Sequence, residues 1–225
     1  MSNILISVMN DKQIKAIIFD MDGVLVDSEP HHTALERRLF NEAGLDVSEA
    51  EHLQFKGKTS DLMWRELIAN KGLTISLHEL NEVYSKAANK YFSELDNLSP
   101  TDGVVKVLDY IRKEGIPVAV ASSSTKEIIN LILQKTELAH YFDFIVSGEE
   151  VKTGKPAPDI FLHTAKLLGV NPGECIVIED SENGIKAAKA AGMKCVAYTG
   201  TGGVEQSKIA DKTINHFGEL KKFLN

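Results

Sequence analysis

The chain has 225 residues, of which 43% are hydrophobic and 25% charged, a composition typical of a folded globular protein and not of a disordered or fibrous one. Its net charge of -7 argues against a dedicated nucleic-acid-binding protein, because such proteins depend on Lys and Arg contacts to phosphates. The two cysteines, Cys175 and Cys195, fit neither a disulfide framework nor a zinc cluster. They are predicted to be reduced packing residues of an intracellular protein.

No apolar run approaches the roughly 18 residues that a membrane-spanning helix needs. The start of the chain holds a short apolar stretch at 4–9, without the basic flank or the small-residue cleavage site of a signal peptide. We therefore expect a cytoplasmic protein that contacts neither membrane nor nucleic acid. A monomer is compatible with the sequence.

Short apolar segments of strand length recur along the chain and alternate with amphipathic helical patterns. These segments are rich in β-branched residues and lack polar alternation, as do strands buried on both faces of a parallel sheet. The predicted strands are 15–20, 116–122, 142–147, 175–180 and 193–198. The predicted helices are 103–114, 125–135, 158–168 and 182–191. The alternation predicts an α/β fold with a doubly wound, mostly parallel sheet.

One interval breaks this alternation, because 29–96 contains helical patterns and no convincing strand. Apolar residues recur there at helical spacing. The stripes are Leu35, Leu39 and Ala43; Met63 and Leu67; and Leu80, Val83, Ala87 and Tyr91. We predict a helical cap domain over 29–96, inserted into a core domain made of 1–28 and 97–225. The two connections between these domains must then lie side by side, where they can form a hinge.

Charged and hydroxyl residues follow four of the segments. Ligands bind outside the carboxyl ends of parallel strands, at the point where the strand order reverses, so these side chains are expected at one edge of the sheet. They are Asp20 and Asp22, Ser122, Lys155, and Glu179 with Asp180. Taken singly, such residues are more often turn residues, helix caps or solvated charges than parts of a site. Their coincidence at one edge is what indicates a site.

The acidic residues of this set would repel one another without compensation. Asp20, Asp22, Glu179 and Asp180 carry four negative charges, and crowded like charges are unfavourable. A divalent cation together with Lys155 leaves a net charge of about -1. Carboxylate oxygens suit Mg²⁺, which keeps several waters and shares the phosphate oxygens of a substrate. The sequence therefore predicts a Mg²⁺ site.

Four segments resemble, in order, the motifs of the haloacid dehalogenase superfamily of phosphotransferases. They are IIFDMDGVLVDSEP (17–30), VAVASSS (118–124), GKPAPDIF (154–161) and VIEDSENGIKAAKAAG (177–192). They are most similar to the β-phosphoglucomutase-like branch, whose members carry a helical cap after the first motif. The resemblance implies a Rossmann-like core, and it covers the chain from about residue 14 onward, cap included.

The resemblance also implies roles for individual residues. Asp20 would be the nucleophile that forms an aspartyl phosphate. Asp22 would protonate the leaving oxygen and then deprotonate the attacking water or hydroxyl. Ser122, Ser123 and Lys155 would hold the phosphoryl oxygens, whose charge must be stabilised during transfer.

The metal ligands follow from the same resemblance. They would be Asp20, the main-chain carbonyl of Asp22, Asp180 and, directly or through water, Glu179. The helical insertion would close over the site as a lid that excludes bulk water.

The cap residues set specificity in this branch, and three of them are candidates for contacts to the substrate. His32 matches the cap histidine of the mutases near the catalytic acid, although a partly exposed structural histidine is the alternative. Lys56 and Lys58 match a cap loop that enters the active site, where they would neutralise a substrate anion; as loop charges they are equally explained as solvated. The other histidines, His52 among them, show no ligand spacing and are assigned no role.

One departure from the family pattern favours hydrolysis. Where the mutases place an arginine for the distal phosphate of the substrate, this chain has Ser60, and the arginine nearest in sequence is Arg65. Lysine replaces a bidentate arginine poorly. We therefore expect a phosphatase of a small phosphorylated metabolite, a sugar phosphate, with β-phosphoglucomutase as the alternative.

Two other classes are less compatible with the sequence. A phospho-receiver signalling domain also combines an aspartate, acidic Mg²⁺ ligands, a Ser or Thr and a Lys, but it lacks a helical insertion and the DxD motif found here. A P-loop at 148–155 is disfavoured because Pro156 stands where a Ser or Thr must bind Mg²⁺.

Overall fold

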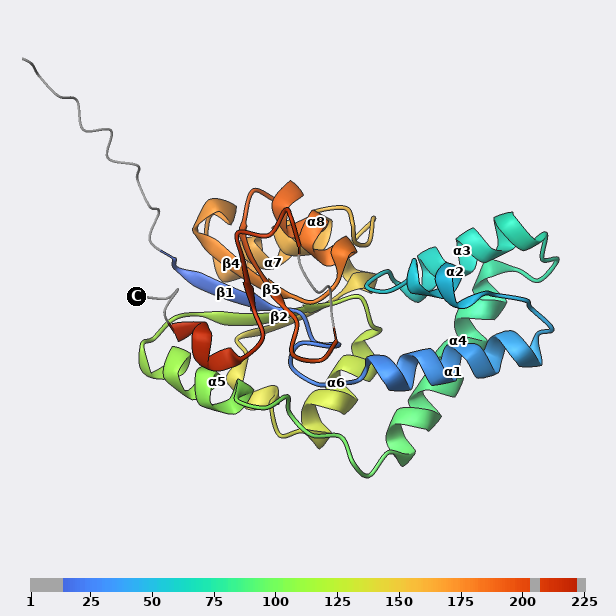
Figure 1. Cartoon of the computed structure of the whole chain (residues 1–225), viewed down its shortest axis with the longest axis horizontal. Coiled ribbons are helices and arrows are strands. Elements are labelled where there is room, and N and C mark those ends of the chain that lie inside the picture. Colours follow the sequence, from blue (N-terminus) through green and yellow to red (C-terminus); the bar gives the residue numbers. More distant parts are fainter. Residues whose placement is uncertain (1–13, 203–206, 222–225) are drawn as a thin grey trace, which may run out of the picture.

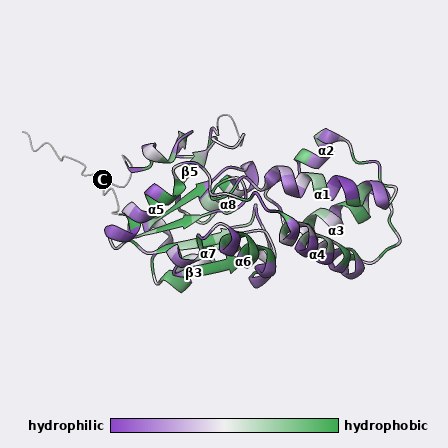
Figure 2. Cartoon of the chain, turned by 90° about the horizontal axis from the view of Figure 1, so that it is seen from below, coloured by the Kyte–Doolittle hydropathy of each residue, from purple (hydrophilic) through white to green (hydrophobic). Residues whose placement is uncertain are grey.

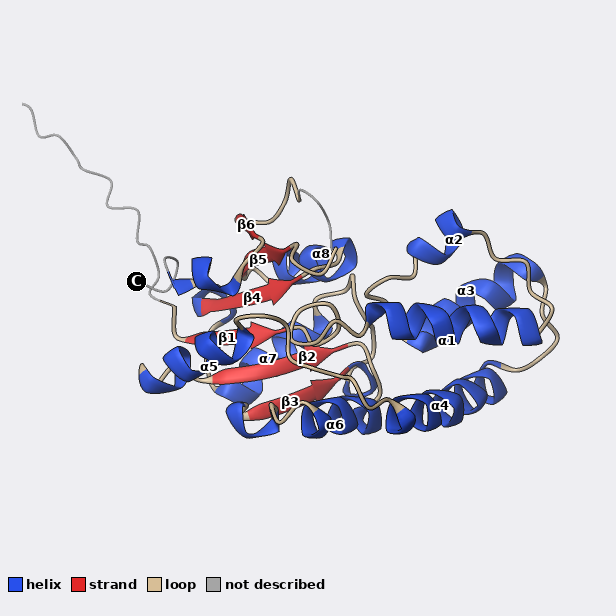
Figure 3. Ribbon diagram, turned by 60° about the horizontal axis from the view of Figure 1, so that its bottom comes forward, coloured by secondary structure: helices blue, strands red, loops and turns tan. Residues whose placement is uncertain are grey.

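A computed structural model describes residues 14–202 and 207–221. Its sheet has six strands, all parallel, in the order β3-β2-β1-β4-β5-β6 (Figures 1 and 3). They are β1 (Ala16–Phe19), β2 (Val118–Ser122), β3 (Phe144–Ser147), β4 (Cys175–Glu179), β5 (Lys194–Tyr198) and β6 (Lys212–Ile214). The predicted doubly wound α/β fold is confirmed. Because β1 is central, between β2 and β4, the strand order reverses beside it.

Helices cover both faces of the sheet. They are α5 (Val104–Lys113), α6 (Lys126–Lys135), α7 (Asp159–Leu168) and α8 (Glu182–Ala190). Along β1, Ile17 and Phe19 join the apolar cluster beneath α5 and α6, whereas Ala16 and Ile18 join the cluster beneath α7 and α8. This two-sided burial explains why the strands show no polar alternation, and Figure 2 shows them as hydrophobic elements between helices with hydrophilic outer faces.

The sixth strand was not predicted from the sequence. β6 has only three residues, and among them only Ile214 is buried. So short a segment gives no periodicity that could distinguish a strand from a loop. The five predicted strands are all present, with ends that differ by one or two residues.

Four helices occupy the interval after β1. They are α1 (Glu29–Glu42), α2 (Glu49–Leu53), α3 (Ser60–Lys71) and α4 (Leu77–Glu94), and no strand lies among the described residues between them. The side chain of Thr59 caps α3, and a capping box between Ser76 and Glu79 begins α4. Both devices satisfy main-chain N–H groups that the first turn of a helix leaves unpaired.

Two of the predicted apolar stripes were partly wrong. Ala43 lies beyond the end of α1 and is exposed. On α4 the buried row continues from Leu80 through Tyr84, Ala88 and Phe92, whereas Val83 is 49% exposed. Both rows are apolar and differ by one residue, so helical periodicity alone cannot choose between them.

The two connections to the insertion lie side by side, as expected. Val26 and Pro100 form an antiparallel bridge, and the Thr101 N–H donates to the Leu25 carbonyl over 2.9 Å. Beyond this point α4 packs along α6. The apolar cluster beneath α5 and α6 continues into the insertion, which lies beyond the carboxyl edge of the sheet (Figure 1). The helices are therefore held next to the strand ends.

Both cysteines are free and buried, as predicted. They pack in the cluster beneath α7 and α8. None of the helices in the described part of the chain combines the length and the apolar character needed to cross a membrane.

Candidate active site

A cavity of about 170 Å³ lies between the carboxyl ends of the central strands and the helical insertion. The core contributes Asp20 and Asp22 from the loop after β1, Ser123 and Ser124 from the loop after β2, and Asp180 from the end of β4. The insertion contributes residues of α1, the loop between α2 and α3, and α4. The cavity thus sits where the strand order reverses, as in other open α/β sheets.

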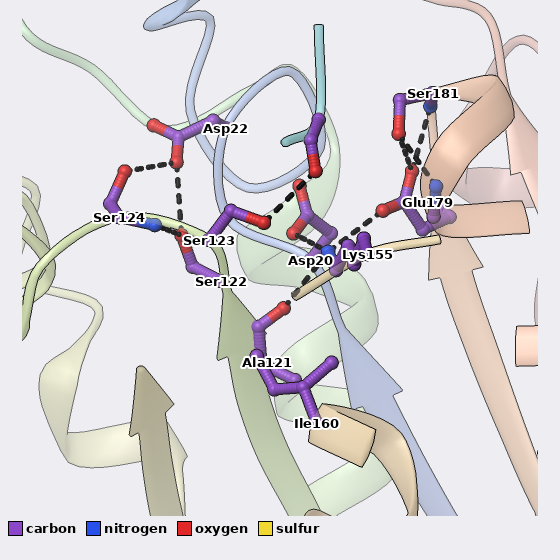
Figure 4. Close-up of polar contacts among 12 residues, drawn as sticks. Asp20, Asp22, Ala121, Ser122, Ser123, Ser124, Lys155, Ile160, Glu179 and Ser181 are labelled. Carbon is purple, nitrogen blue, oxygen red and sulfur yellow. Dashed lines mark hydrogen bonds and ion pairs between the residues drawn. The ribbon is translucent and has the colours of Figure 1, made fainter. Parts of the chain in front are cut away.

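Lys155 holds two carboxylates at the centre of the site (Figure 4). Its Nζ lies 2.5 Å from Asp20 Oδ1 and 2.8 Å from Glu179 Oε1, and it also donates to the Ala121 carbonyl over 3.3 Å. These acceptors use all three donors of the ammonium group. Burial alone would lower the pKa of Lys155, but the two carboxylates raise it well above its usual range. Lys155 therefore remains charged. The peptide bond that joins it to Pro156 is cis.

Asp20, Glu179 and Asp180 form a buried acidic cluster. Each offers a carboxylate oxygen within 4.8 Å of those of the other two. Burial raises the pKa of Asp20, against the opposing charge of Lys155, and the neighbouring carboxylates raise it further. Excess negative charge and hard oxygen donors at this spacing fit Mg²⁺.

The oxygens of Glu179 are already engaged within the protein. Oε1 accepts from Lys155, and Oε2 accepts from the main-chain N–H and the hydroxyl of Ser181 over 2.7 and 3.0 Å. Asp20 and Asp180 are therefore better placed to bind a metal directly. Next to Asp180 the chain comes so close at Gly23 that an added Cβ would lie 2.3 Å from Oδ2. The main chain beside Asp22 thus lies against the acidic cluster.

The Asp22 carboxylate accepts four hydrogen bonds. Oδ1 accepts from Ser28 over 2.5 Å and contacts His32 Nε2 at 3.1 Å, and Oδ2 accepts from Ser122 and Ser124 over 3.0 and 2.9 Å. Burial would raise the pKa of Asp22, but the charge of His32 and these hydrogen bonds hold it well below its usual range. Asp22 is therefore ionised and fixed in orientation.

His32 begins a chain of contacts that runs into the insertion. Burial would lower the pKa of His32, but the Asp22 carboxylate raises it to about 9. On its other side, Nδ1 lies 3.3 Å from the Tyr84 hydroxyl, which also reaches Glu36 over 3.4 Å. Glu36 in turn lies 2.6 Å from His52 Nε2. His52, to which the sequence assigned no role, is thus a buried member of this chain.

The loop between α2 and α3 is docked on the core. Lys56 Nζ lies 2.8 Å from Asp180 Oδ2, and its carbonyl accepts from Asn183 over 2.8 Å. The Gly57 carbonyl accepts from the Ser123 hydroxyl over 2.9 Å. Gly57 has φ +75°, and an added Cβ would lie 2.3 Å from Ser181 Oγ. Only glycine fits this approach without strain.

With the geometry described, the chain can be compared with known proteins. Residues 17–198 match the family described as haloacid dehalogenase-like hydrolase. The chain belongs to this family. Among its curated relatives is the phosphorylated carbohydrates phosphatase of Thermotoga maritima, 34% identical over 80% of this chain and 83% of that protein. The fructose-1-phosphate phosphatase YqaB of Escherichia coli is also 34% identical, over 80% of this chain and 94% of that protein.

A solved structure extends the similarity to almost the whole chain. The β-phosphoglucomutase of Clostridium difficile is 30% identical, covers 95% of this chain and 98% of its own, and superposes with a TM-score of 0.82. This haloacid dehalogenase-like hydrolase is therefore a phosphoric monoester hydrolase or a closely related phosphomutase.

Most of the residues singled out from the sequence of this hydrolase do meet at one place. Asp20, Asp22, Lys155 and Glu179 lie together at the carboxyl ends of the strands (Figure 4). Asp180 joins them through the acidic cluster. His32 and Lys56 reach them from the insertion.

The polar groups of three further candidates are engaged by protein groups around the cavity. The Ser122 hydroxyl, fully buried, donates to Asp22, and that of Ser123 donates to the docked loop. Lys58 lines the cavity, but its Nζ is paired with Glu66 at 2.7 Å.

Sequence reasoning missed several residues of the site. Ser28 and Ser124 bind Asp22, and Tyr84 binds His32. Glu29 lines the cavity, and burial together with the Asp180 carboxylate raises its pKa to about 7. The sequence offered one signal for Ser28, Glu29 and Ser124, because they lie inside the motif segments 17–30 and 118–124. Nothing in the sequence marked Tyr84.

Proposed function

We propose that this chain is a Mg²⁺-dependent phosphatase that hydrolyses a small phosphorylated metabolite, a sugar phosphate, through an aspartyl phosphate on Asp20. The observation that carries the proposal is the pairing of two neighbouring aspartates with different cations. Asp20 is paired with Lys155, and Asp22 with His32. Two carboxylates held in different environments suit different tasks, nucleophile and acid–base. The two relatives named above, a phosphatase of phosphorylated carbohydrates and one of fructose 1-phosphate, support the substrate class.

In the first half-reaction, a carboxylate oxygen of Asp20 attacks phosphorus, and the bond from phosphorus to the sugar oxygen breaks. The leaving oxygen takes a proton from Asp22. Asp22 is ionised in the resting structure, but protonated His32 contacts it at 3.1 Å, so the pair holds the one proton that is required. We assign His32 the role of supplying that proton to Asp22.

In the second half-reaction, Asp22 accepts a proton from a water molecule, whose oxygen attacks the aspartyl phosphate. The bond between phosphorus and Asp20 breaks, and inorganic phosphate is released. The proton that Asp22 takes from the water then passes back to His32 across their contact. The net reaction consumes one water and leaves both aspartates and the protonated His32 as they began.

The charged groups of the site stabilise the phosphoryl oxygens. Lys155, permanently protonated, places its ammonium 2.5 Å from the Asp20 oxygen where the group arrives. Mg²⁺ bound by Asp20, Asp180 and the main-chain carbonyl of Asp22 would supply further positive charge against those oxygens. Glu179 would then act by fixing Lys155.

In this proposal the helices of 29–96 form a cap domain over a core of 1–28 and 97–225. The docked loop at Lys56 and Gly57 supports this role, because it joins the insertion to the rim of the cavity. A closed cap excludes bulk water and strengthens the electrostatic contacts inside.

β-Phosphoglucomutase activity is the second candidate, because the solved mutase of Clostridium difficile matches nearly the whole chain. Against it stands Ser60, which lines the cavity at the position where mutases carry an arginine. A hydroxyl cannot hold a distal phosphate as a bidentate guanidinium does.

A phosphate-release screen with Mg²⁺ tests the proposal. It would cover sugar phosphates, nucleotides and pyrophosphate, and β-glucose 1-phosphate with a trace of the 1,6-bisphosphate. Sugar phosphates should release phosphate, and Asp20→Asn should abolish this release while Asp27→Asn, an exposed aspartate nearby, should not. Activity of Asp20→Asn above a few per cent would falsify the mechanism. Glucose 6-phosphate formed without free phosphate would favour the mutase.

A further inference from the structure

One wall of the cavity is a stripe along α1. Glu29, Thr33 and Arg37 recur at four-residue spacing and all line the cavity, as residues on one face of a helix do. Figure 1 shows α1 running away from the carboxyl edge of the sheet. Arg37 therefore lies about two turns, or about 12 Å along the axis, beyond Glu29. The same cavity reaches from Asp20 to Arg37.

The other cationic and imidazole side chains that line this cavity have acidic partners. Lys56 is paired with Asp180, Lys58 with Glu66, His32 with Asp22, and His52 with Glu36. In each of these contacts an acidic side chain of the protein lies against the basic one. They leave little net attraction for an anion on the cap side.

Arg37 is the exception. Its side chain is half-buried, and it forms no ion pair or hydrogen bond with any residue in 14–202 or 207–221. A guanidinium cannot lose its proton in a protein, so its charge persists and is only partly solvated. The next residue, Arg38, faces outward and is paired with Glu42 at 3.6 Å. Among the described residues, Arg37 thus presents to the cavity a guanidinium that is paired with none of the carboxylates lining it.

We propose that Arg37 is a specificity-determining residue that binds a second anionic group, phosphate or carboxylate, at the end of the substrate away from the transferred phosphoryl group. The inference rests on the proposed function and narrows its substrate class to metabolites with two anionic ends. The planar guanidinium matches either anion with two parallel hydrogen bonds.

Matched substrate pairs test the proposal. Phosphate release would be compared for fructose 1-phosphate against fructose 1,6-bisphosphate, and for glucose 6-phosphate against 6-phosphogluconate, which separates a distal phosphate from a distal carboxylate. The wild type should prefer the doubly anionic member of at least one pair. Arg37→Ala should lower kcat/KM for that member by about 10- to 100-fold, as expected for a lost charge-assisted bidentate contact. The same change should leave the neutral-tailed member almost unchanged.

Two further variants show what the effect depends on. Arg37→Lys should recover only part of the preference, because an ammonium lacks the fork geometry. Arg38→Ala removes an equal charge from the outer side of the same helix and should behave as the wild type. If Arg37→Ala lowers both members equally, or if the wild type has no preference for a second anion, the inference is wrong although the phosphatase proposal stands.

A binding measurement keeps the inference testable if no substrate is turned over. In the Asp20→Asn background, titration calorimetry with fructose 1,6-bisphosphate and fructose 1-phosphate would give the ratio of the two dissociation constants. Arg37→Ala added to that background should reduce the ratio by about 10- to 100-fold. An unchanged ratio would overturn the inference, whereas absence of turnover in the wild type would count only against the proposed function.

Discussion

The His32 imidazole and the Asp22 carboxylate form an ion pair that joins the helical insertion to the sheet, with Nε2 3.1 Å from Oδ1. His32 lies near the start of α1, and Asp22 follows β1. Each side chain is only 12% exposed, so water screens the pair weakly and each group sustains the charge of the other. The pair is therefore a contact between the insertion and the core, and in the proposed mechanism it holds the proton that the leaving oxygen takes.

The first prediction is that the pair makes stability fall in alkaline solution. The pKa of His32 rises from an ordinary 6.5 to about 9 on folding. A group whose pKa is higher in the folded protein than in the unfolded chain contributes its full stabilisation below the unfolded pKa. That contribution is lost as the pH rises through the folded pKa. The free energy of unfolding should thus fall by about 3 kcal/mol between pH 6.5 and 9. Urea unfolding in EDTA would measure this fall.

His32→Gln provides the control for this pH dependence. The variant should be less stable than the wild type at pH 6.5, and the difference should shrink toward pH 9.5. Asp180, whose pKa is raised to about 6, changes charge mostly below pH 6.5. Glu29, whose pKa is raised to about 7, changes charge at the lower end of the range, but it does so in both proteins. Parallel stability curves for the two proteins from pH 7 to 9.5 would rule out a charged His32.

A second prediction concerns Tyr84, which supports His32 from the side opposite Asp22. Tyr84→Phe removes the hydroxyl that lies 3.3 Å from His32 Nδ1 and keeps the ring that packs in the core. Without this hydrogen bond His32 is held less firmly, and the activation barrier should rise by about 1 kcal/mol. This should lower kcat roughly fivefold with little change in KM. Steady-state kinetics on the best substrate of the screen would measure this.

Tyr91→Phe is the matched control on the same helix. Its hydroxyl lies 3.2 Å from Nδ1 of the neighbouring His31, which forms no hydrogen bond or ion pair with the described Asp20 or Asp22. This variant should keep full activity. Equal losses in the two variants would show that the hydroxyl of Tyr84 acts through general packing and not through His32.

The third prediction tests the docked loop through a glycine. Gly57→Ala would place a Cβ 2.3 Å from Ser181 Oγ at φ +75°, so the loop must retreat from the core. A displacement of about 1 Å in a closed site can cost about 100-fold in rate, and we expect a fall in kcat/KM of that order. The fold should persist, because the loop lies at the surface of the insertion.

Gly72→Ala is the control that separates backbone strain from the loss of the loop contact with the core. Gly72 ends α3 at φ +65° and has open space around it. Its replacement should cost about 1 kcal/mol of stability from backbone strain and leave activity unchanged. If Gly57→Ala behaves in the same way, the loop contact has no role in catalysis.

The strand-end residues could be predicted from sequence because their position depends only on the pattern of elements. A buried strand at 15–20 fixes where Asp20 emerges, and parallel neighbours bring Lys155 and Asp180 to the same edge. Strand length and hydrophobicity determine this arrangement without any detail of side-chain packing.

The contacts made by the insertion could not be predicted in the same way. On α4, the choice between Val83 and Tyr84 as the buried residue is a rotation of one position, which depends on how the helix packs on its neighbours. That rotation brings Tyr84 to His32. The position of Arg37 in the cavity likewise depends on the direction of α1. Arg65 is nearer to Ser60 in sequence, but it is paired with Asp61 on the surface.

The last prediction concerns the acidic cluster and its cation. Without a metal, Asp20, Glu179 and Asp180 crowd their carboxylates within 4.8 Å, and Lys155 compensates only part of the charge. Mg²⁺ at about 100 times its dissociation constant should add about 2.7 kcal/mol to stability, which corresponds to a rise in Tm of roughly 5–10 °C for a chain of this size. Thermal unfolding in EDTA and in Mg²⁺ would measure the shift.

Asp180→Asn tests whether the cation binds at this cluster, through the thermal unfolding of the variant and the wild type in EDTA and in Mg²⁺. In EDTA the variant should unfold at nearly the same temperature as the wild type, because the relief of repulsion in the cluster offsets the loss of the ion pair with Lys56. In Mg²⁺ it should gain far less, because a carboxylate ligand is missing. Asp27→Asn, which removes an exposed aspartate between β1 and α1, should respond as the wild type does. A full Mg²⁺ shift in Asp180→Asn would place the cation somewhere other than this cluster.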